Sequence, residues 1–183
     1  MPDMPIYEIK ITLKVIQPPV WRCIHAPGNI SLYKLHRIFQ VAMGWTNSHL
    51  YEFQIEKVRL GDPDPEEPDG TLSARKFKLA KLAADGINKF IYLYDFGDNW
   101  KHEVIIEKQL PAQESANYPV CVAGRRACPP EDCGGVHGYE SLMEIMANPD
   151  HKEYGDMISW LGGRFDPELF DLAKVNHGLK SLR

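Results

Sequence analysis

The stretch Tyr7-Glu-Ile-Lys-Ile-Thr-Leu-Lys-Val15 alternates apolar and polar residues without a break. This period of two is typical of a strand with one buried face, because successive side chains of a strand point to opposite faces. After Pro18-Pro19, the segment from Val20 to Ala26 has the composition of a second strand. The two segments predict a hairpin at the start of the chain.

The segments that follow switch between helical and strand patterns. Ser31 can cap a helix, the apolar residues behind it recur with helical spacing, and Gly44 ends the pattern. Alternating or fully apolar runs predict three more strands, at residues 49–58, 90–96 and 100–110. Short helices are predicted at 139–147 and 153–161, and a third is expected to begin at Asp166-Pro167.

This order of elements predicts an α+β fold, because strands do not alternate regularly with helices. We expect a mixed or antiparallel sheet of about five strands in the order β-β-α-β-β-β, followed by a lobe of short helices. The 183 residues suit a single domain, 1–183, with a sheet-and-helix core at 1–110 and a Cys-rich loop and helical lobe at 111–183. The segment 61–70, with three prolines and five acids, is expected to be a surface loop.

Charge and hydropathy exclude some classes of protein. The formal net charge of -4 and the pI of about 6.0 disfavour broad binding to phosphate backbones. No apolar run approaches the roughly 18 residues that span a bilayer, and the first residues lack the segments of a signal peptide. We therefore expect a cytoplasmic protein with no membrane association.

Three of the four cysteines are clustered, at Cys121, Cys128 and Cys133. Their spacings of six and four intervening residues, within a Gly- and Pro-rich segment, allow the backbone to wrap around an ion. Clustered thiols in a reducing compartment favour metal binding over disulfides. The cluster therefore predicts a zinc site.

A tetrahedral zinc site with three thiolates needs a fourth ligand, and His102 is the first choice because it lies on the apolar face of its strand. His137 and His49 are the alternatives. An inward histidine and buried free thiols are also common core residues, which is the competing interpretation. The full predicted ligand set is Cys121, Cys128, Cys133 and His102.

Acidic residues also gather near this segment, at Asp95, Asp98, Glu131 and Asp132. They can serve as general bases or as ligands for a second, harder cation. Alternatively, they cap turns and helix ends, as Asp does beside Gly and Asn.

Several motifs along the chain together resemble one known family. They are Pro19-Val-Trp-Arg22, Leu35-His36, Gly44-Trp45, His49-Leu50, Tyr94-Asp-Phe-Gly-Asp-Asn-Trp-Lys-His102, Cys128-Pro-Pro-Glu-Asp-Cys-Gly-Gly135 and Gly138-Tyr139. On these residues the chain resembles the plasmid pRiA-type ORF-three-like family, also described as passenger proteins of transposable elements, from about Tyr7 to Asn176. The resemblance implies an α+β fold without an agreed activity, a DNA-related context, and signature motifs that include His102, Cys128 and Cys133.

Three functions follow as hypotheses, and the sequence does not decide whether the protein is an enzyme. The first is a zinc-stabilised binding or adaptor module whose surface recruits an unknown protein or nucleic-acid partner. The second is a metal-dependent hydrolase with Asp95, Asp98 or Glu131 around an open metal position. The third is a nucleic-acid-binding accessory protein with a local patch that includes Arg125 and Arg126.

Overall fold

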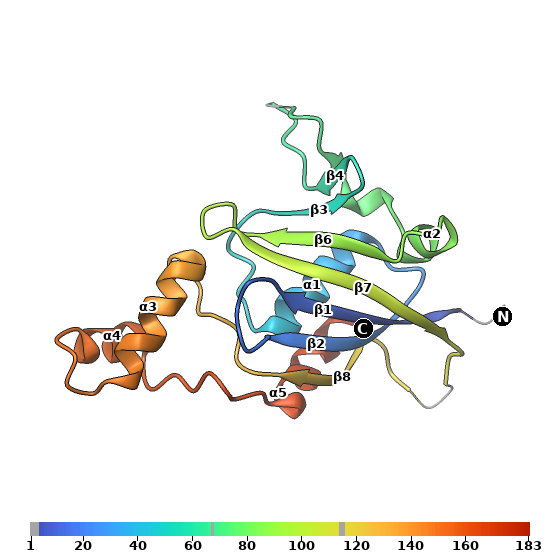
Figure 1. Cartoon of the computed structure of the whole chain (residues 1–183). Coiled ribbons are helices and arrows are strands. Elements are labelled where there is room, and N and C mark those ends of the chain that lie inside the picture. The colour runs from blue at the N-terminus through green and yellow to red at the C-terminus, as the bar shows by residue number, and fades with distance from the viewer. Residues whose placement is uncertain (1–3, 67, 114–115) are drawn as a thin grey trace.

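The computed structural model describes residues 4–66, 68–113 and 116–183, in which one eight-stranded sheet is surrounded by helices (Figure 1). In sheet order the strands are β5 (Leu72–Ser73), β4 (Val58–Gly61), β3 (Tyr51–Ile55), β6 (Lys89–Tyr94), β7 (Trp100–Leu110), β1 (Ile6–Leu13), β2 (Trp21–Pro27) and β8 (Val120–Arg125). Neighbouring strands pair antiparallel, apart from the parallel pair β4–β5. The sheet is therefore mixed.

The chain is α+β, but the prediction of a sheet of about five strands is wrong, because the structure adds β4, β5 and β8. The strand predicted at 49–58 is two strands, since the chain turns back at Glu56, which has a φ of 52°. β8 lies in the segment predicted to be a metal-wrapping loop, and it pairs with the edge of β2. Such short strands depend on a neighbouring edge, so the residue pattern alone does not reveal them.

The helices of the described ranges are α1 (Leu32–Met43), α2 (Leu79–Ala84), α3 (Gly135–Ala147), α4 (Tyr154–Leu161) and α5 (Leu172–Leu179), with short 3₁₀ turns η1 (Ala74–Lys76) and η2 (Lys180–Leu182). The predicted caps of α1 are confirmed, because the Ser31 side chain accepts a hydrogen bond from the Lys34 N–H and Gly44 has a φ of 97°. The prediction that a helix begins at Asp166-Pro167 is wrong. The backbone oxygen of Pro167 instead accepts a hydrogen bond from the Ala127 N–H. The last helix begins after Asp171.

The main core lies between α1 and one face of the sheet. The ring centroids of Phe39 on α1 and Tyr92 on β6 are 5.3 Å apart, and those of Phe53 and Tyr92 are 5.1 Å apart. All the apolar residues of β1 that were predicted to face inward within Tyr7–Leu13 are buried. Figure 1 shows α1 behind the sheet and α5 below it, where α5 contacts α1 and β8.

α3 and α4 contact each other and form a lobe beyond the end of the sheet where β6 turns into β7 (Figure 1). The start of α3 touches that turn closely, because a Cβ on Gly135 would lie 2.6 Å from the backbone oxygen of Asp98. Gly135 also has a φ of 67°, which favours glycine. Two segments distant in the sequence are thereby held side by side at the place where polar side chains gather.

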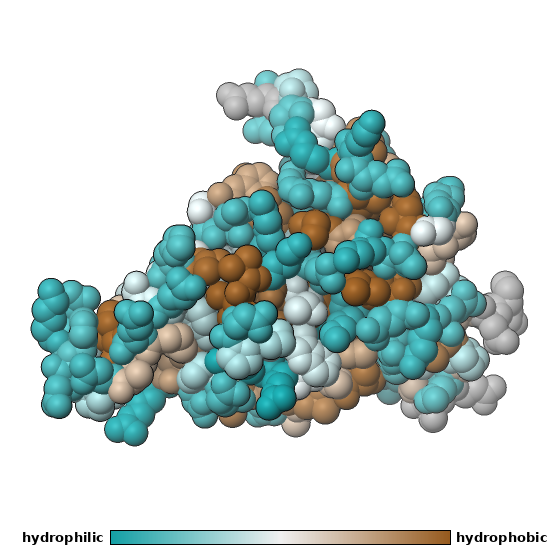
Figure 2. Space-filling view, in the orientation of Figure 1, coloured by the Kyte–Doolittle hydropathy of each residue, from teal (hydrophilic) through white to brown (hydrophobic). Residues whose placement is uncertain are grey.

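The visible surface of the molecule is largely hydrophilic, with separate apolar patches over the sheet (Figure 2). Within the described residues, no helix combines the length and the apolar character that a membrane crossing requires.

Candidate metal site

The structure does not bring the four predicted zinc ligands together. Cys121 lies in β8, Cys128 in the loop after it, Cys133 just before α3, and His102 on β7. Among the described residues, two sets of at least three His, Cys, Asp or Glu side chains have ligand atoms within 4.8 Å of one another, and neither set contains any of the four. Zinc binding by these residues stays a prediction.

The thiols are held as neutral groups. Cys121 Sγ donates a hydrogen bond to the backbone oxygen of Ala123 in its own strand, 3.3 Å away. Burial raises the pKa of the Cys121 and Cys128 thiols, and it raises the pKa of Cys133 to about 12. Without a bound metal ion, these side chains are therefore neutral thiols at neutral pH.

His102 faces the core, as predicted, and is fully buried. Its Nδ1 lies 3.2 Å from the backbone oxygen of Tyr92, and its ring meets the Trp45 ring edge to face at 5.3 Å between centroids. Burial lowers the pKa of His102 to about 3. The imidazole is a neutral core group, and the alternative ligand His137 points into solvent with 98% of its side chain exposed.

A different set of side chains does converge, namely His49, Asp95 and Asp132. His49 Nε2 lies 3.1 Å from Asp132 Oδ1 and 3.7 Å from Asp95 Oδ2. Glu131 Oε2 is 3.8 Å from the same nitrogen. These residues come from the loop before β3, the end of β6 and the loop between β8 and α3. Tertiary packing, and not sequence proximity, assembles the site.

His49 is positioned by a loop that is hydrogen-bonded to the core. The preceding Asn47, with a φ of 60°, has its side-chain oxygen bonded to Nε2 of the buried His36 on α1. The backbone N–H of Ser48 donates to the Tyr94 hydroxyl at 3.1 Å. The loop is thus fastened to α1 and to β6, which fixes where the His49 ring lies.

Asp95 directly follows β6 and is only 6% exposed. Its Oδ1 accepts hydrogen bonds from the backbone N–H groups of Gly97 at 2.9 Å and Asp98 at 3.3 Å. Because these bonds occupy Oδ1, Oδ2 is the oxygen that faces His49.

Glu131 is anchored in the same manner. Its Oε1 accepts hydrogen bonds from the Thr46 N–H at 2.7 Å and from the Tyr94 hydroxyl at 3.1 Å. Burial, and next the charge of Glu131, raises the pKa of Tyr94, so this hydroxyl stays a donor. Neighbours that hold one carboxylate oxygen orient the other, as outer partners of metal ligands do.

The cluster carries excess negative charge. In the described part of the chain, no Lys or Arg lies within ion-pair distance of Asp95, Glu131 or Asp132. His49 Nε2 is buried and makes no hydrogen bond, since the approach of Asp132 lies outside hydrogen-bond geometry. One imidazole among carboxylates suits Mn²⁺, Fe²⁺ or Zn²⁺.

In the other converging set, Glu8, Cys23 and Glu107, basic side chains pair with the Glu8 carboxylate. Glu8 pairs with His25 at 2.7 Å and with Lys108 at 3.0 Å. Hydrogen bonds from these partners lower the pKa of Glu8. Neighbouring side chains already provide the positive charge that an ion would supply.

The predicted arginine patch is divided between core and surface. Arg126 is 6% exposed. Its guanidinium donates hydrogen bonds to Glu168 Oε1 at 2.7 Å and to the backbone oxygen of Pro18 at 2.6 Å. Arg125 alone is exposed. This geometry does not favour a paired phosphate contact.

Sequence reasoning named every member of the converging cluster but did not join them. The sequence offers His49 as an alternative partner of the thiols, and the acids as general bases, as ligands for a second cation or as caps. The available signal lies in the motifs: His49-Leu50, the segment Tyr94–His102 and the segment Cys128–Gly135 each contribute to the site.

Fold and site together define an α+β protein with a candidate metal centre of one histidine and several carboxylates. The chain belongs to the plasmid pRiA4b ORF-3-like protein family, whose model matches residues 5–174. This finding confirms the resemblance seen in the motifs.

Two relatives span nearly the whole chain. The uncharacterized protein y4hQ of Sinorhizobium fredii is 38% identical over 179 residues, which is 97% of this chain and 92% of that protein. The crystal structure of a protein of unknown function, MM3350 from Methanosarcina mazei Go1, is similar with a TM-score of 0.84 and 40% identity. That match covers 93% of this chain and 97% of the other.

Proposed function

We propose that this protein is a metal-dependent hydrolase whose divalent ion is held by His49, Asp95 and Asp132. The observation that supports this proposal is His49 Nε2, which is buried without a hydrogen bond and faces three carboxylates. Three protein ligands leave coordination positions for water and substrate. The Asp132 side chain is 69% exposed, so one side of the cluster reaches solvent.

Glu131 is the proposed general base. A divalent ion in such a site acts as a Lewis acid and lowers the pKa of a bound water. Glu131 keeps Oε1 on Thr46 and Tyr94 while Oε2 stays 3.8 Å from His49 Nε2. That oxygen is placed to accept a proton from water at the site.

A pocket of about 280 Å³ adjoins the cluster and provides room for a substrate. Glu131 and Asp132 line it from one side, and Trp160 and Leu161 of α4 line it from the other. Trp160 is 51% exposed and offers an aromatic surface to an apolar part of a substrate.

Zinc, the ion predicted from the cysteines, is also one of the ions proposed for the His49 cluster. The adaptor and nucleic-acid hypotheses have less support, because the thiols lie in the core and Arg126 is already bonded to Glu168. A hydrolytic site requires ligands with an open side beside a pocket, and the His49 cluster meets both requirements.

Calorimetry tests the proposal on protein freed of metal with a chelator and titrated with Mn²⁺ or Zn²⁺. We expect one ion per chain, and Asp132→Asn is expected to weaken binding at least about tenfold. Asp150→Asn, a change of an exposed aspartate outside the site, serves as the matched control. Absence of binding, or binding that Asp132→Asn leaves unchanged, would contradict the metal site.

Hydrolysis is then assayed on the loaded protein with bis-p-nitrophenyl phosphate and p-nitrophenyl acetate. We expect turnover that requires the metal and is lost in Glu131→Gln, while that variant still binds one ion per chain. Metal binding without turnover of either ester would leave a metal-binding protein and remove the hydrolase assignment.

A further inference from the structure

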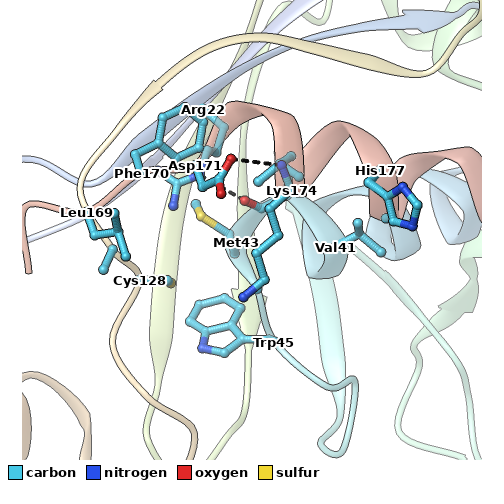
Figure 3. A pocket seen from close by; sticks show the side chains of 15 residues that line it. Arg22, Val41, Met43, Trp45, Cys128, Leu169, Phe170, Asp171, Lys174 and His177 are labelled. Carbon is cyan, nitrogen blue, oxygen red and sulfur yellow. Dashed lines mark hydrogen bonds between the residues drawn. The ribbon is translucent and has the colours of Figure 1, made fainter. Parts of the chain in front are cut away.

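A second cavity, of about 550 Å³, opens between the end of α1, the loop after β8 and α5 (Figure 3). Its volume lies in the range of small-molecule sites. Most of its wall is apolar, with contributions from Val41, Met43, Trp45, Leu169 and Phe170. Such a wall suits the hydrophobic part of a ligand.

Arg22 lines this cavity and is only 2% exposed. Its guanidinium donates to the backbone oxygens of Trp21, Ala42, Arg125 and Arg126. An arginine has five N–H donors, so these four bonds leave one N–H on Nη2. Phe170 covers one face of the guanidinium, 4.3 Å from its carbon to the ring centroid.

The charge of Arg22 lacks an acidic partner within ion-pair distance in the described residues. Burial lowers its pKa, and the ionisable groups that oppose this shift are Cys128 and Cys121. Arginine is rarely buried without a counter-charge, since desolvation of an isolated charge is costly.

Lys174 adds a second positive group at the cavity. Figure 3 shows its side chain reaching across the opening toward Trp45. The one carboxylate in the lining, Asp171, already caps α5 by accepting the Lys174 backbone N–H at 2.9 Å. The cavity therefore combines an apolar wall with two cationic side chains and one engaged carboxylate.

We propose that this cavity binds a small organic monocarboxylate with an apolar tail or ring, with the carboxylate directed to Arg22 and Lys174 and the apolar part against Trp45 and Met43. A carboxylate accepts hydrogen bonds from both kinds of cation and offsets the unpaired charge. The site is separate from the His49 cluster and does not depend on the proposed hydrolase function.

Titration calorimetry with octanoate, 1-octanol and octylammonium tests the proposal, because the three probes share a tail and differ in charge. We expect octanoate to bind at least about tenfold more tightly than either other probe. Lys174→Glu should weaken octanoate binding about tenfold and reduce the preference for the anion. Lys180→Glu makes the same charge change on an exposed residue of η2, outside the cavity, and should leave the affinity unchanged.

A second variant tests the location of the ligand. Leu169 is 61% exposed and lines the cavity, so Leu169→Glu should repel the carboxylate without disturbing the core, which thermal unfolding checks. Equal affinity for octanoate and octanol overturns the proposal. So does octanoate binding that is absent up to millimolar concentration, or that both variants leave unchanged.

Discussion

The segment from Cys121 to Cys133 and the cluster around His49 both contain metal-ligating residue types, but they differ in whether the ligand atoms converge. The cysteines are near in sequence, yet neither converging set of at least three ligand atoms in the described residues contains Cys121, Cys128 or Cys133. The cluster around His49 collects residues from three loops, and hydrogen bonds leave one oxygen of Asp95 and of Glu131 facing the imidazole. Convergence of oriented ligand atoms, and not spacing in the chain, therefore distinguishes a candidate site.

The largest expected effect is the loss of metal binding in His49→Ala. Because this change removes a proposed ligand, we expect the affinity for Mn²⁺ or Zn²⁺ to fall by about 100-fold or more, which is about 2.7 kcal/mol. Calorimetry on chelator-treated protein measures it. His137→Ala, which removes a 98% exposed imidazole, is the control and should have no effect. Equal metal affinities of the two variants would show that His49 is not a ligand and would remove the proposed site.

The next effect concerns stability in acid, which depends on the fully buried His102. Its pKa falls from 6.5 to about 3 on folding, so below about pH 6.5 the unfolded chain binds a proton that the folded protein does not. The stabilising contribution is full above pH 6.5 and is lost as the pH falls toward 3. Each pH unit corresponds to about 1.4 kcal/mol.

Urea unfolding at pH 7 and pH 5 measures this linkage. His102→Leu should lose about 2 kcal/mol less free energy of unfolding between the two pH values than the parent protein. An unchanged pH dependence would show that His102 is not held as a buried neutral group in the folded protein.

A smaller effect is expected at Tyr94, which orients Glu131 and the loop that carries His49. Tyr94→Phe removes the hydroxyl that donates to Glu131 and accepts from Ser48. We expect metal affinity to fall about tenfold, in keeping with the loss of an outer partner. Tyr118→Phe, which removes a hydroxyl outside the hydrogen bonds of the cluster, is the control. A full loss of affinity in Tyr94→Phe would make Tyr94 a ligand instead.

The smallest effect is expected at the thiols. Cys128→Ser and Cys133→Ser should leave metal affinity within about twofold of the parent, because neither thiol belongs to the proposed ligand set of His49, Asp95 and Asp132. Ligation by three thiolates would release about three protons per zinc ion, whereas carboxylates release almost none. Proton release during a Zn²⁺ titration, followed with a pH indicator, therefore separates the two regions.

The pattern of residues predicted the interior of the sheet well. β1, β2, β6 and β7 and the capped helix α1 carry strong local periodicity, and each lies at or near its expected position. The edge strands carry no such signal. β5 has two residues and β8 contains a glycine, and their backbone hydrogen bonds depend on partners that the local sequence does not specify.

Local alternation and capping determined which segments of this chain become strands and helices, because those choices depend on contacts between residues a few positions apart. The inward orientation of His102 followed from the same periodicity. His49, Asp95 and Asp132 come together only because the sheet packs against the start of α3. Residues so distant in the chain make no local contacts, so the sequence pattern does not reveal that they are close in space. The burial that keeps the cysteines protonated has the same tertiary origin.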